Sequence, residues 1–198
     1  MKKIILAFSM LLGIYTVQSC NTGTSGEDTV DSTKDVNDSM AKVSNDSTTM
    51  NTMMVDKDDA DFAVEAANDG MTEVAVSQLA DKNASSQKVK DFATMIIQDH
   101  TAANDKLKSI AAAKNIALPP AMSDKSQNDV NDLTKKTGND FDKAYMNMMV
   151  SDHNDAISLF KKEGDNGKDG DLKNFAMSTL PTLQQHLDKA KSIKDMLK

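Results

Sequence analysis

Apolar residues recur at intervals of three and four from about residue 58 to the end of the chain. This spacing predicts amphipathic helices, because residues three and four apart lie on the same face of an α-helix. Gly and Pro residues interrupt the pattern and divide it into separate segments. We predict four long helices at about 59–82, 86–115, 139–163 and 170–197, and a short amphipathic turn around Val130 and Leu133.

The links between these helices are short after the first and the third, and longer in the middle. Short links favour antiparallel neighbours. A β-sandwich or barrel is excluded by the small share of aromatic residues, 4% of the 198 residues. The sequence therefore predicts an all-α fold in which residues 58–198 form an antiparallel four-helix bundle.

The first residues have the features of an export signal. Lys2 and Lys3 precede an apolar run over 4–17, which is shorter than the roughly 20 residues needed to span a bilayer. Ser19 then directly precedes Cys20, the only cysteine, as in the lipobox of bacterial lipoproteins. This resemblance implies a lipoprotein signal peptide at 1–19 and a lipid anchor at Cys20. An ordinary signal peptide and an uncleaved anchor helix are the alternatives, and both also place the chain outside the cytoplasm.

Residues 20–57 read as a linker. Seven acidic residues and three lysines give 21–57 a net charge of −4, and this stretch contains no aromatic residue. Such a composition buries too little apolar surface to offset the entropy of ordering. We expect a disordered tether whose root-mean-square reach is roughly 30 to 35 Å.

Charge and motifs exclude several classes of function. The chain carries a net charge of −7, and all 23 of its basic residues are lysine, so a surface that tracks phosphates is excluded and no nucleic-acid partner is expected. A single cysteine excludes a multi-cysteine metal site. No phosphate-binding loop, nucleophile elbow or zinc-protease motif is present, which favours a non-enzymatic protein.

The three histidines of the chain fall on the apolar faces of three different predicted helices, and Glu73 falls on the fourth. With a rise of 1.5 Å per residue, Glu73, His100 and His153 lie at about 21 to 22 Å from one end of the bundle. His186 lies at about 16 Å from the same end. The four side chains are therefore predicted to share one layer, in which Asp69 competes with Glu73.

Imidazole and carboxylate groups together are typical ligands of zinc, copper or iron. The predicted ligands are Glu73, His100, His153 and His186. Asp99 and Asp152 each precede a histidine and can accept a ring N–H from a neighbouring helix, while Asp69 and Met149 lie close to the layer; these four residues are predicted to support the ligands. Two alternatives remain open: a hydrogen-bonded histidine layer without metal, and a pocket for a small ligand.

Several segments together resemble the family known as domain of unknown function 4142: 62–80, 89–93, 99–104, 141–142, 152–153 and 180–187. The pairs Asp99-His100 and Asp152-His153 are among its recurrent positions, as are Glu73 and His186. The chain departs from the family at Asp69, where Asn is common. The resemblance covers about 60–196. It implies an exported bacterial helical bundle similar in fold to ferritin-like domains, with no established activity.

Members of this family are often described as outer-membrane proteins. Together with the lipobox, this resemblance implies a lipid-anchored protein of the cell envelope that faces the periplasm, with a membrane as its partner through Cys20. The outer membrane is expected from the family, although the residue after Cys20, Asn21, fits either membrane. A looser similarity to an exported ferritin-like family that uses His and Met for copper makes copper the first metal to test. The alternative is a structural or partner-binding module with a hydrogen-bonded His/Asp core.

Overall fold

The computed structural model describes residues 28–46 and 55–197, and these ranges contain six α-helices and no β-strand. The prediction of an all-α protein is confirmed. The helices are α1 (Thr29–Asp46), α2 (Lys57–Asn83), α3 (Gln87–Lys114), α4 (Asp124–Thr134), α5 (Gly138–Asn166) and α6 (Gly170–Met196). The four long helices α2, α3, α5 and α6 match the predicted ranges to within three residues at each end, whereas α1 and α4 are additional.

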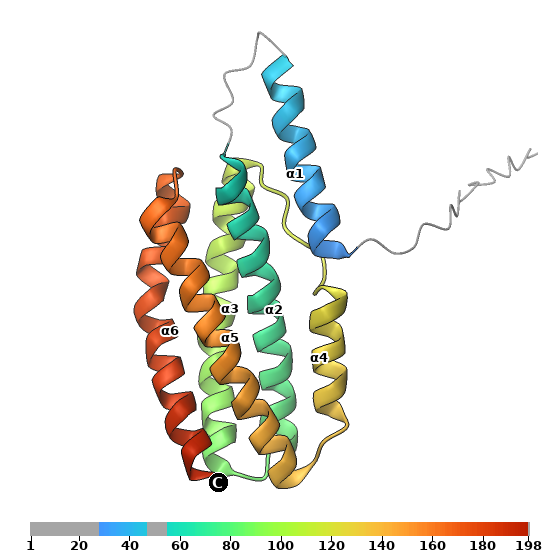
Figure 1. Cartoon of the computed structure of the whole chain (residues 1–198), viewed down its shortest axis with the longest axis vertical. Coiled ribbons are helices and arrows are strands. Elements are labelled where there is room, and N and C mark those ends of the chain that lie inside the picture. Colours follow the sequence, from blue (N-terminus) through green and yellow to red (C-terminus); the bar gives the residue numbers. More distant parts are fainter. Residues whose placement is uncertain (1–27, 47–54, 198) are drawn as a thin grey trace, which may run out of the picture.

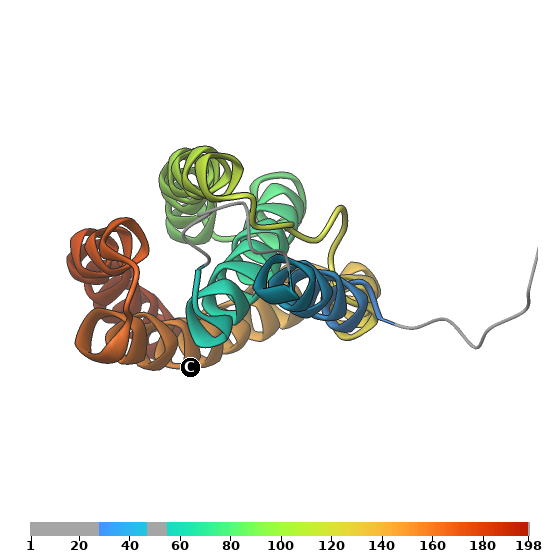
Figure 2. The same cartoon turned by 90° about the horizontal axis from the view of Figure 1, so that it is seen from above.

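Each of the four long helices packs against two of the others. Helix α2 contacts α3 and α5, and α6 contacts α5 and α3. Neighbouring long helices run in opposite directions, as Figure 1 shows. Helices α1 and α4 both pack against α2, and the view from above shows them on the same side of the molecule (Figure 2).

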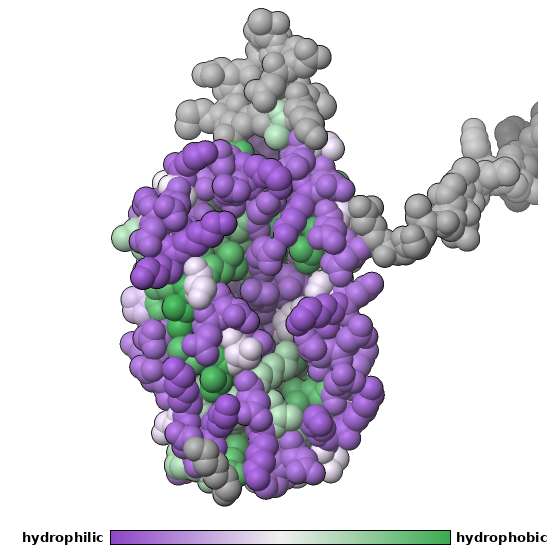
Figure 3. Space-filling view, viewed as in Figure 1, coloured by the Kyte–Doolittle hydropathy of each residue, from purple (hydrophilic) through white to green (hydrophobic). Residues whose placement is uncertain are grey.

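The apolar core is divided into two clusters. One contains Phe62, Phe160 and Phe175, and the ring centroids of Phe62 and Phe160 lie 5.1 Å apart. The other contains Phe92 and Tyr145. Hydrophilic residues cover most of the face shown in Figure 3. Along each long helix a buried Glu or His separates the residues of one cluster from those of the other: Glu73, His100, His153 and His186.

Helix α1 corrects the expectation of a disordered tether over 20–57. It begins after Asp28, whose carboxylate accepts a hydrogen bond from the Val30 amide at 2.9 Å. Asn37 docks the helix, because its side chain donates to the Ala117 carbonyl at 3.0 Å and accepts from the Ala117 amide at 2.8 Å. The prediction of disorder rested on the small apolar surface of this segment. Helix α1 forms nevertheless, because polar contacts such as these also hold it in place.

The other predictions for the N-terminal part concern residues outside the described ranges. These are the signal peptide at 1–19, the lipidation of Cys20, and the linker residues 20–27 and 47–54. None of the helices in the described ranges has the length and apolar character needed to cross a bilayer.

Helix α4 replaces the short turn predicted around Val130 and Leu133. Its first turn is capped by Ser123, whose hydroxyl accepts a hydrogen bond from the Ser126 amide at 3.1 Å. Leu133 is buried in the second core cluster, and Val130 packs against that cluster. The segment is amphipathic as predicted, but it forms a helix of 11 residues and not a short turn.

The start of α3 is held by a residue of another helix. Ser86 occupies the N-cap position, but its side chain makes no capping hydrogen bond. The carboxylate of Asp142, on α5, accepts hydrogen bonds from the backbone amides of Ser85 at 3.0 Å and Ser86 at 2.8 Å. Because Asp142 is buried, this contact fixes the α2–α3 turn against the start of α5.

The sequence predicted that α5 ends at Gly164, but the helix ends later. The helix continues to Asn166, and α6 begins after Asp169, which caps it by accepting from the amides of Asp171 and Leu172. A Cβ atom at Gly164 would lie 3.2 Å from the side chain of Met177 on α6. Gly164 therefore serves close packing between α5 and α6, and the helix ends later.

Candidate metal centre

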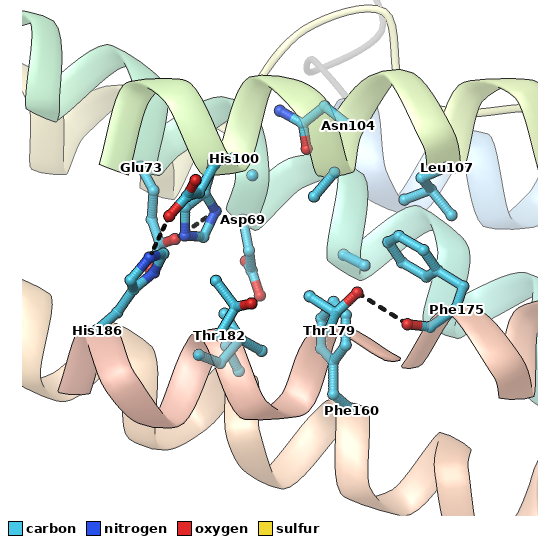
Figure 4. A pocket seen from close by; sticks show the side chains of 16 residues that line it. Asp69, Glu73, His100, Asn104, Leu107, Phe160, Phe175, Thr179, Thr182 and His186 are labelled. Carbon is cyan, nitrogen blue, oxygen red and sulfur yellow. Dashed lines mark hydrogen bonds and ion pairs between the residues drawn. The ribbon is translucent and has the colours of Figure 1, made fainter. Parts of the chain in front are cut away.

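The structure brings Glu73, His100, His153 and His186 together in the middle of the core. They come from α2, α3, α5 and α6 respectively, and each side chain is buried, with exposed fractions of 0 to 8%. The ring centroids of the three histidines lie 5.3 to 5.6 Å apart. Figure 4 shows His100 and His186 approaching each other from facing helices, with Glu73 beside His100.

One nitrogen of each ring faces an acceptor. Nδ1 of His100 lies 2.8 Å from Oε2 of Glu73. Nδ1 of His153 lies 3.2 Å from Oε1 of Glu73 and 2.9 Å from the carbonyl oxygen of Met149. Nε2 of His186 lies 2.9 Å from Oδ2 of Asp99. Carboxylates and carbonyls only accept hydrogen bonds, so these three ring nitrogens carry the protons.

The other nitrogen of each ring is buried and, within the described part of the chain, has no hydrogen-bond partner. These atoms are Nε2 of His100, Nε2 of His153 and Nδ1 of His186. In a neutral imidazole whose other nitrogen is protonated, such an atom carries a lone pair. When all three rings are neutral, the arrangement therefore leaves three lone pairs without partners in the core.

The spacing of the three rings suits a metal ion. One possible ligand atom from each ring lies within 4.8 Å of those from the other two. Nitrogens bound at 2.0 to 2.1 Å to a tetrahedral ion are about 3.3 Å apart. The ligand atoms thus need to approach one another by at most about 1.5 Å, which small side-chain rotations supply.

Burial keeps two of the three rings neutral. Burial opposes ionisation of Glu73, but the neighbouring His100 and His153 lower its pKa to about 2. Burial lowers the pKa values of His153 and His186, so both rings are neutral at pH 7. For His100 burial acts in the same direction, but the contact with Glu73 outweighs it and raises the pKa. His100 is therefore the ring that holds a second proton most strongly.

The four residues predicted to support the ligands all lie close to the histidine layer. Asp99 on α3 accepts from His186 on α6, which is the contact between helices that the sequence predicted for it. Met149 contributes its carbonyl oxygen to His153. Asp69 and Asp152 line a hollow of about 120 Å³ that Glu73 also reaches, and Asp69 lines the smaller cavity beside His100 as well. Burial and the charge of Glu73 raise the pKa of both aspartates to about 7.

A small cavity of about 30 Å³ adjoins His100 and His186. Its volume is sufficient for one water molecule. Its walls include Leu107, Phe160 and Phe175, and Figure 4 shows these side chains along the cavity. Thr179 and Thr182 also line it, seven and four residues before His186 on the same face of α6. The apolar pattern of this helix includes Thr179, whereas Thr182 was missed from the sequence.

Comparison with known proteins places the chain in a family. A family model described as "Domain of unknown function (DUF4142)" matches residues 44–193, which contain the three histidines, Glu73 and all of helices α2 to α5. No curated protein and no solved structure matches the chain. Since the model covers more than half of the sequence, the chain belongs to the DUF4142 family.

Proposed function

We propose that this protein binds one transition-metal ion through His100, His153 and His186. The observation that carries the proposal is the set of three buried ring nitrogens without partners. Leaving one buried polar atom unsatisfied costs about 1 to 3 kcal/mol, and here three lie in one layer. A bound ion would turn all three from unpaired groups into ligands.

Glu73 and Asp99 are the supports of this site. Glu73 was predicted as a fourth ligand. Its Oε2 atom faces the protonated Nδ1 of His100 at 2.8 Å. Its Oε1 atom lies 3.2 Å from Nδ1 of His153, which hydrogen-bonds to the Met149 carbonyl, so Oε1 has no hydrogen-bond partner in the described ranges. A carboxylate in that position orients a ligand ring and increases its basicity. We therefore assign Oε2 of Glu73 to His100, and Asp99 to His186, as the carboxylates that orient these rings. The small cavity beside His100 and His186 leaves room for a water molecule as the fourth ligand.

Three imidazoles suit zinc, copper and iron. Copper is tested first because of the looser resemblance to an exported copper-binding family, and zinc and iron follow. The experiment measures the metal content of protein produced without a histidine tag and then dialysed against each ion. One ion per chain is expected, and His100→Ala should abolish binding. Asp105→Ala, an exposed position on α3, is the matched control and should retain the ion.

The result against the proposal is a folded protein that holds much less than one equivalent of any of the three ions. Circular dichroism and a melting curve on each variant separate loss of ligand from loss of fold. His186→Ala provides a second test if His100→Ala does not fold. Because His100 is paired with Glu73, its removal also leaves a buried carboxylate, which His186→Ala avoids.

A second candidate function is a structural or partner-binding module without metal. It is favoured by the hydrogen bond or ion pair that every ring makes through its first nitrogen. On this alternative, each histidine variant lowers the melting temperature, and added metal raises the melting temperature of neither the variants nor the parent protein. The metal-binding proposal expects a rise for the parent alone.

We also propose that the four long helices form a four-helix bundle of the ferritin-like type. Their antiparallel packing supports the proposal, with α1 and α4 as additions to one side. An experimental structure of the full chain tests it. Helices whose order around the core differs from α2, α3, α6 and α5 would contradict it.

We further propose that Cys20 carries a lipid that anchors the protein in the cell envelope, facing the periplasm, and that the membrane is the outer one. The support is the Ser19-Cys20 pair after an apolar run. Labelling with a radioactive fatty acid should mark the parent protein and leave Cys20→Ser unmarked. Membrane fractionation should then find the protein in the outer-membrane fraction.

A further inference from the structure

A second group of carboxylates lies far along the helices from the histidines, where α2 begins and α5 ends. It surrounds a hollow of about 230 Å³, large enough for an ion and several water molecules. The N-terminal end of α2 and the C-terminal end of α5 lie together in Figure 1. Six acidic residues and three lysines line the hollow: Asp56, Asp58, Asp59, Asp61, Glu65, Glu163, Lys34, Lys162 and Lys168.

Glu163 is the central group of this hollow. Its side chain belongs to a residue that is only 5% exposed, and its Oε1 atom is buried without a hydrogen-bond partner in the described ranges. A Cβ atom at position 167 would lie 2.4 Å from Oε1, so Gly167 leaves the space that the carboxylate occupies. The local structure thus accommodates a buried carboxylate and provides nothing to satisfy one of its oxygens.

Asp61 contributes a second unused oxygen. Its Oδ2 atom accepts a hydrogen bond from Lys57 at 2.7 Å, whereas Oδ1 is buried and has no partner in the part of the chain described. Asp61 and Glu163 come from different helices and line the same hollow. Two buried carboxylate oxygens from facing elements are a typical start of a cation site.

Burial and the neighbouring negative charges make the ionised form of Glu163 unfavourable. Burial and the negative charges of Asp59 and Asp169 raise the pKa of Glu163 to about 7. Asp59 cannot move away, because it is buried and accepts hydrogen bonds from the backbone amides of Lys168 and Asp169. A cation in the hollow would relieve this repulsion.

Two of the three lysines have other partners. Lys168 binds Asp56 at 2.6 Å, and Lys34 binds Glu65. The third, Lys162, is exposed. Lys168 and Lys34 thus offset carboxylates other than Glu163 and Asp61. Lys57 pairs with one oxygen of Asp61 and leaves the other unused. The charges of Lys173 and Lys162 act on Glu163 but do not outweigh burial and the neighbouring carboxylates.

We propose that this hollow binds a hard divalent cation, Ca²⁺ in the first place, through carboxylate oxygens of Glu163 and Asp61. Ca²⁺ takes six to eight oxygen ligands at 2.3 to 2.6 Å and tolerates irregular geometry, so water molecules complete the shell in a hollow of this size. Mg²⁺ requires a tighter octahedral arrangement, so we expect it to bind more weakly than Ca²⁺ at this site. The site contains no histidine and is independent of the transition-metal site.

The test is isothermal titration of the full chain with CaCl₂ after treatment with a chelator. One equivalent of Ca²⁺ should bind, and Glu163→Gln should reduce the affinity at least tenfold, with Asp61→Asn reducing it in the same direction. Gln has the shape of Glu, so the fold should be kept, and circular dichroism checks this. Asp140→Asn, an exposed residue in the first turn of α5, is the matched control and should bind Ca²⁺ like the parent.

Two further measurements make the result decisive. His153→Ala should keep its Ca²⁺ affinity, which separates this site from the histidine centre. Gly167→Ala should weaken Ca²⁺ binding, because the added methyl group displaces the Glu163 carboxylate. The proposal is overturned if millimolar Ca²⁺ does not bind, or if Glu163→Gln and Asp140→Asn bind it equally, since that would indicate diffuse attraction to an acidic surface.

Discussion

Oδ2 of Asp99, on α3, lies 2.9 Å from Nε2 of His186, on α6. This contact orients the His186 ring so that its other nitrogen, Nδ1, lies in the core. Asp99→Ala should therefore weaken metal binding by about 10- to 100-fold, the usual effect of removing such a support. A competitive titration with a coloured chelator measures the change. Asp105→Ala, an exposed position on the same helix, is the control, and an equal effect of both variants would contradict the assigned role.

Metal affinity should fall as the pH falls. A protonated imidazole cannot bind a metal, and the contact with Glu73 raises the pKa of His100 above its ordinary value of 6.5. Below the pKa of His100 the ion must displace a proton, so affinity should fall by about tenfold for each pH unit. Chelator titrations between pH 5 and 8.5 measure this slope. A full complement of ion retained at pH 5 with unchanged affinity would exclude histidine ligands.

The docking of α1 should depend on one side chain. Asn37→Ala removes both hydrogen bonds to Ala117 and leaves a partly buried backbone amide and carbonyl without partners. We expect the free energy that holds α1 in place to fall by about 1 to 3 kcal/mol. Hydrogen exchange of the α1 amides should then become faster, while that of α3 and α6 is unchanged. Ser39→Ala, exposed on the same helix, should change neither rate.

Outside the histidine layer, Asp142 should be the polar residue whose substitution destabilises the fold most. Its carboxylate accepts from two backbone amides and from the hydroxyl of Ser85, all near the first turn of α3. Asp142→Ala should lower the free energy of unfolding by about 3 kcal/mol, since hydrogen bonds to a buried charge are lost together. Urea denaturation measures the loss. Asp140→Ala, exposed two residues earlier, should change it by less than about 0.5 kcal/mol.

The long helices could be predicted because their apolar residues repeat regularly over 25 residues or more. The meeting of the three histidines followed from the same pattern, since residues on apolar faces at similar depths must lie close together. His186 was placed about 5 Å away from the others along the bundle, yet its ring is as close to His100 and His153 as they are to each other. The relative shift of packed helices is set by side-chain interlocking, which helix lengths do not contain.

The orientation of Glu73 could not be predicted. Its position on the inner face of α2 was correct, but the sequence does not tell which nitrogen of a histidine a carboxylate meets. That choice depends on side-chain rotamers in the packed core. Helix α1 was missed for a related reason: Asn37 reads as a linker residue until Ala117, 80 positions later, supplies its partner.

Helix α1 also limits the distance between the helical domain and a membrane in which Cys20 would be anchored. With a lipid on Cys20, only seven residues separate the anchored cysteine from Asp28, which caps the helix. A chain of this length spans at most about 30 Å even when fully extended. Since α1 packs against α2, such an anchor would hold the side of the molecule that carries α1 within that distance of the lipid headgroups.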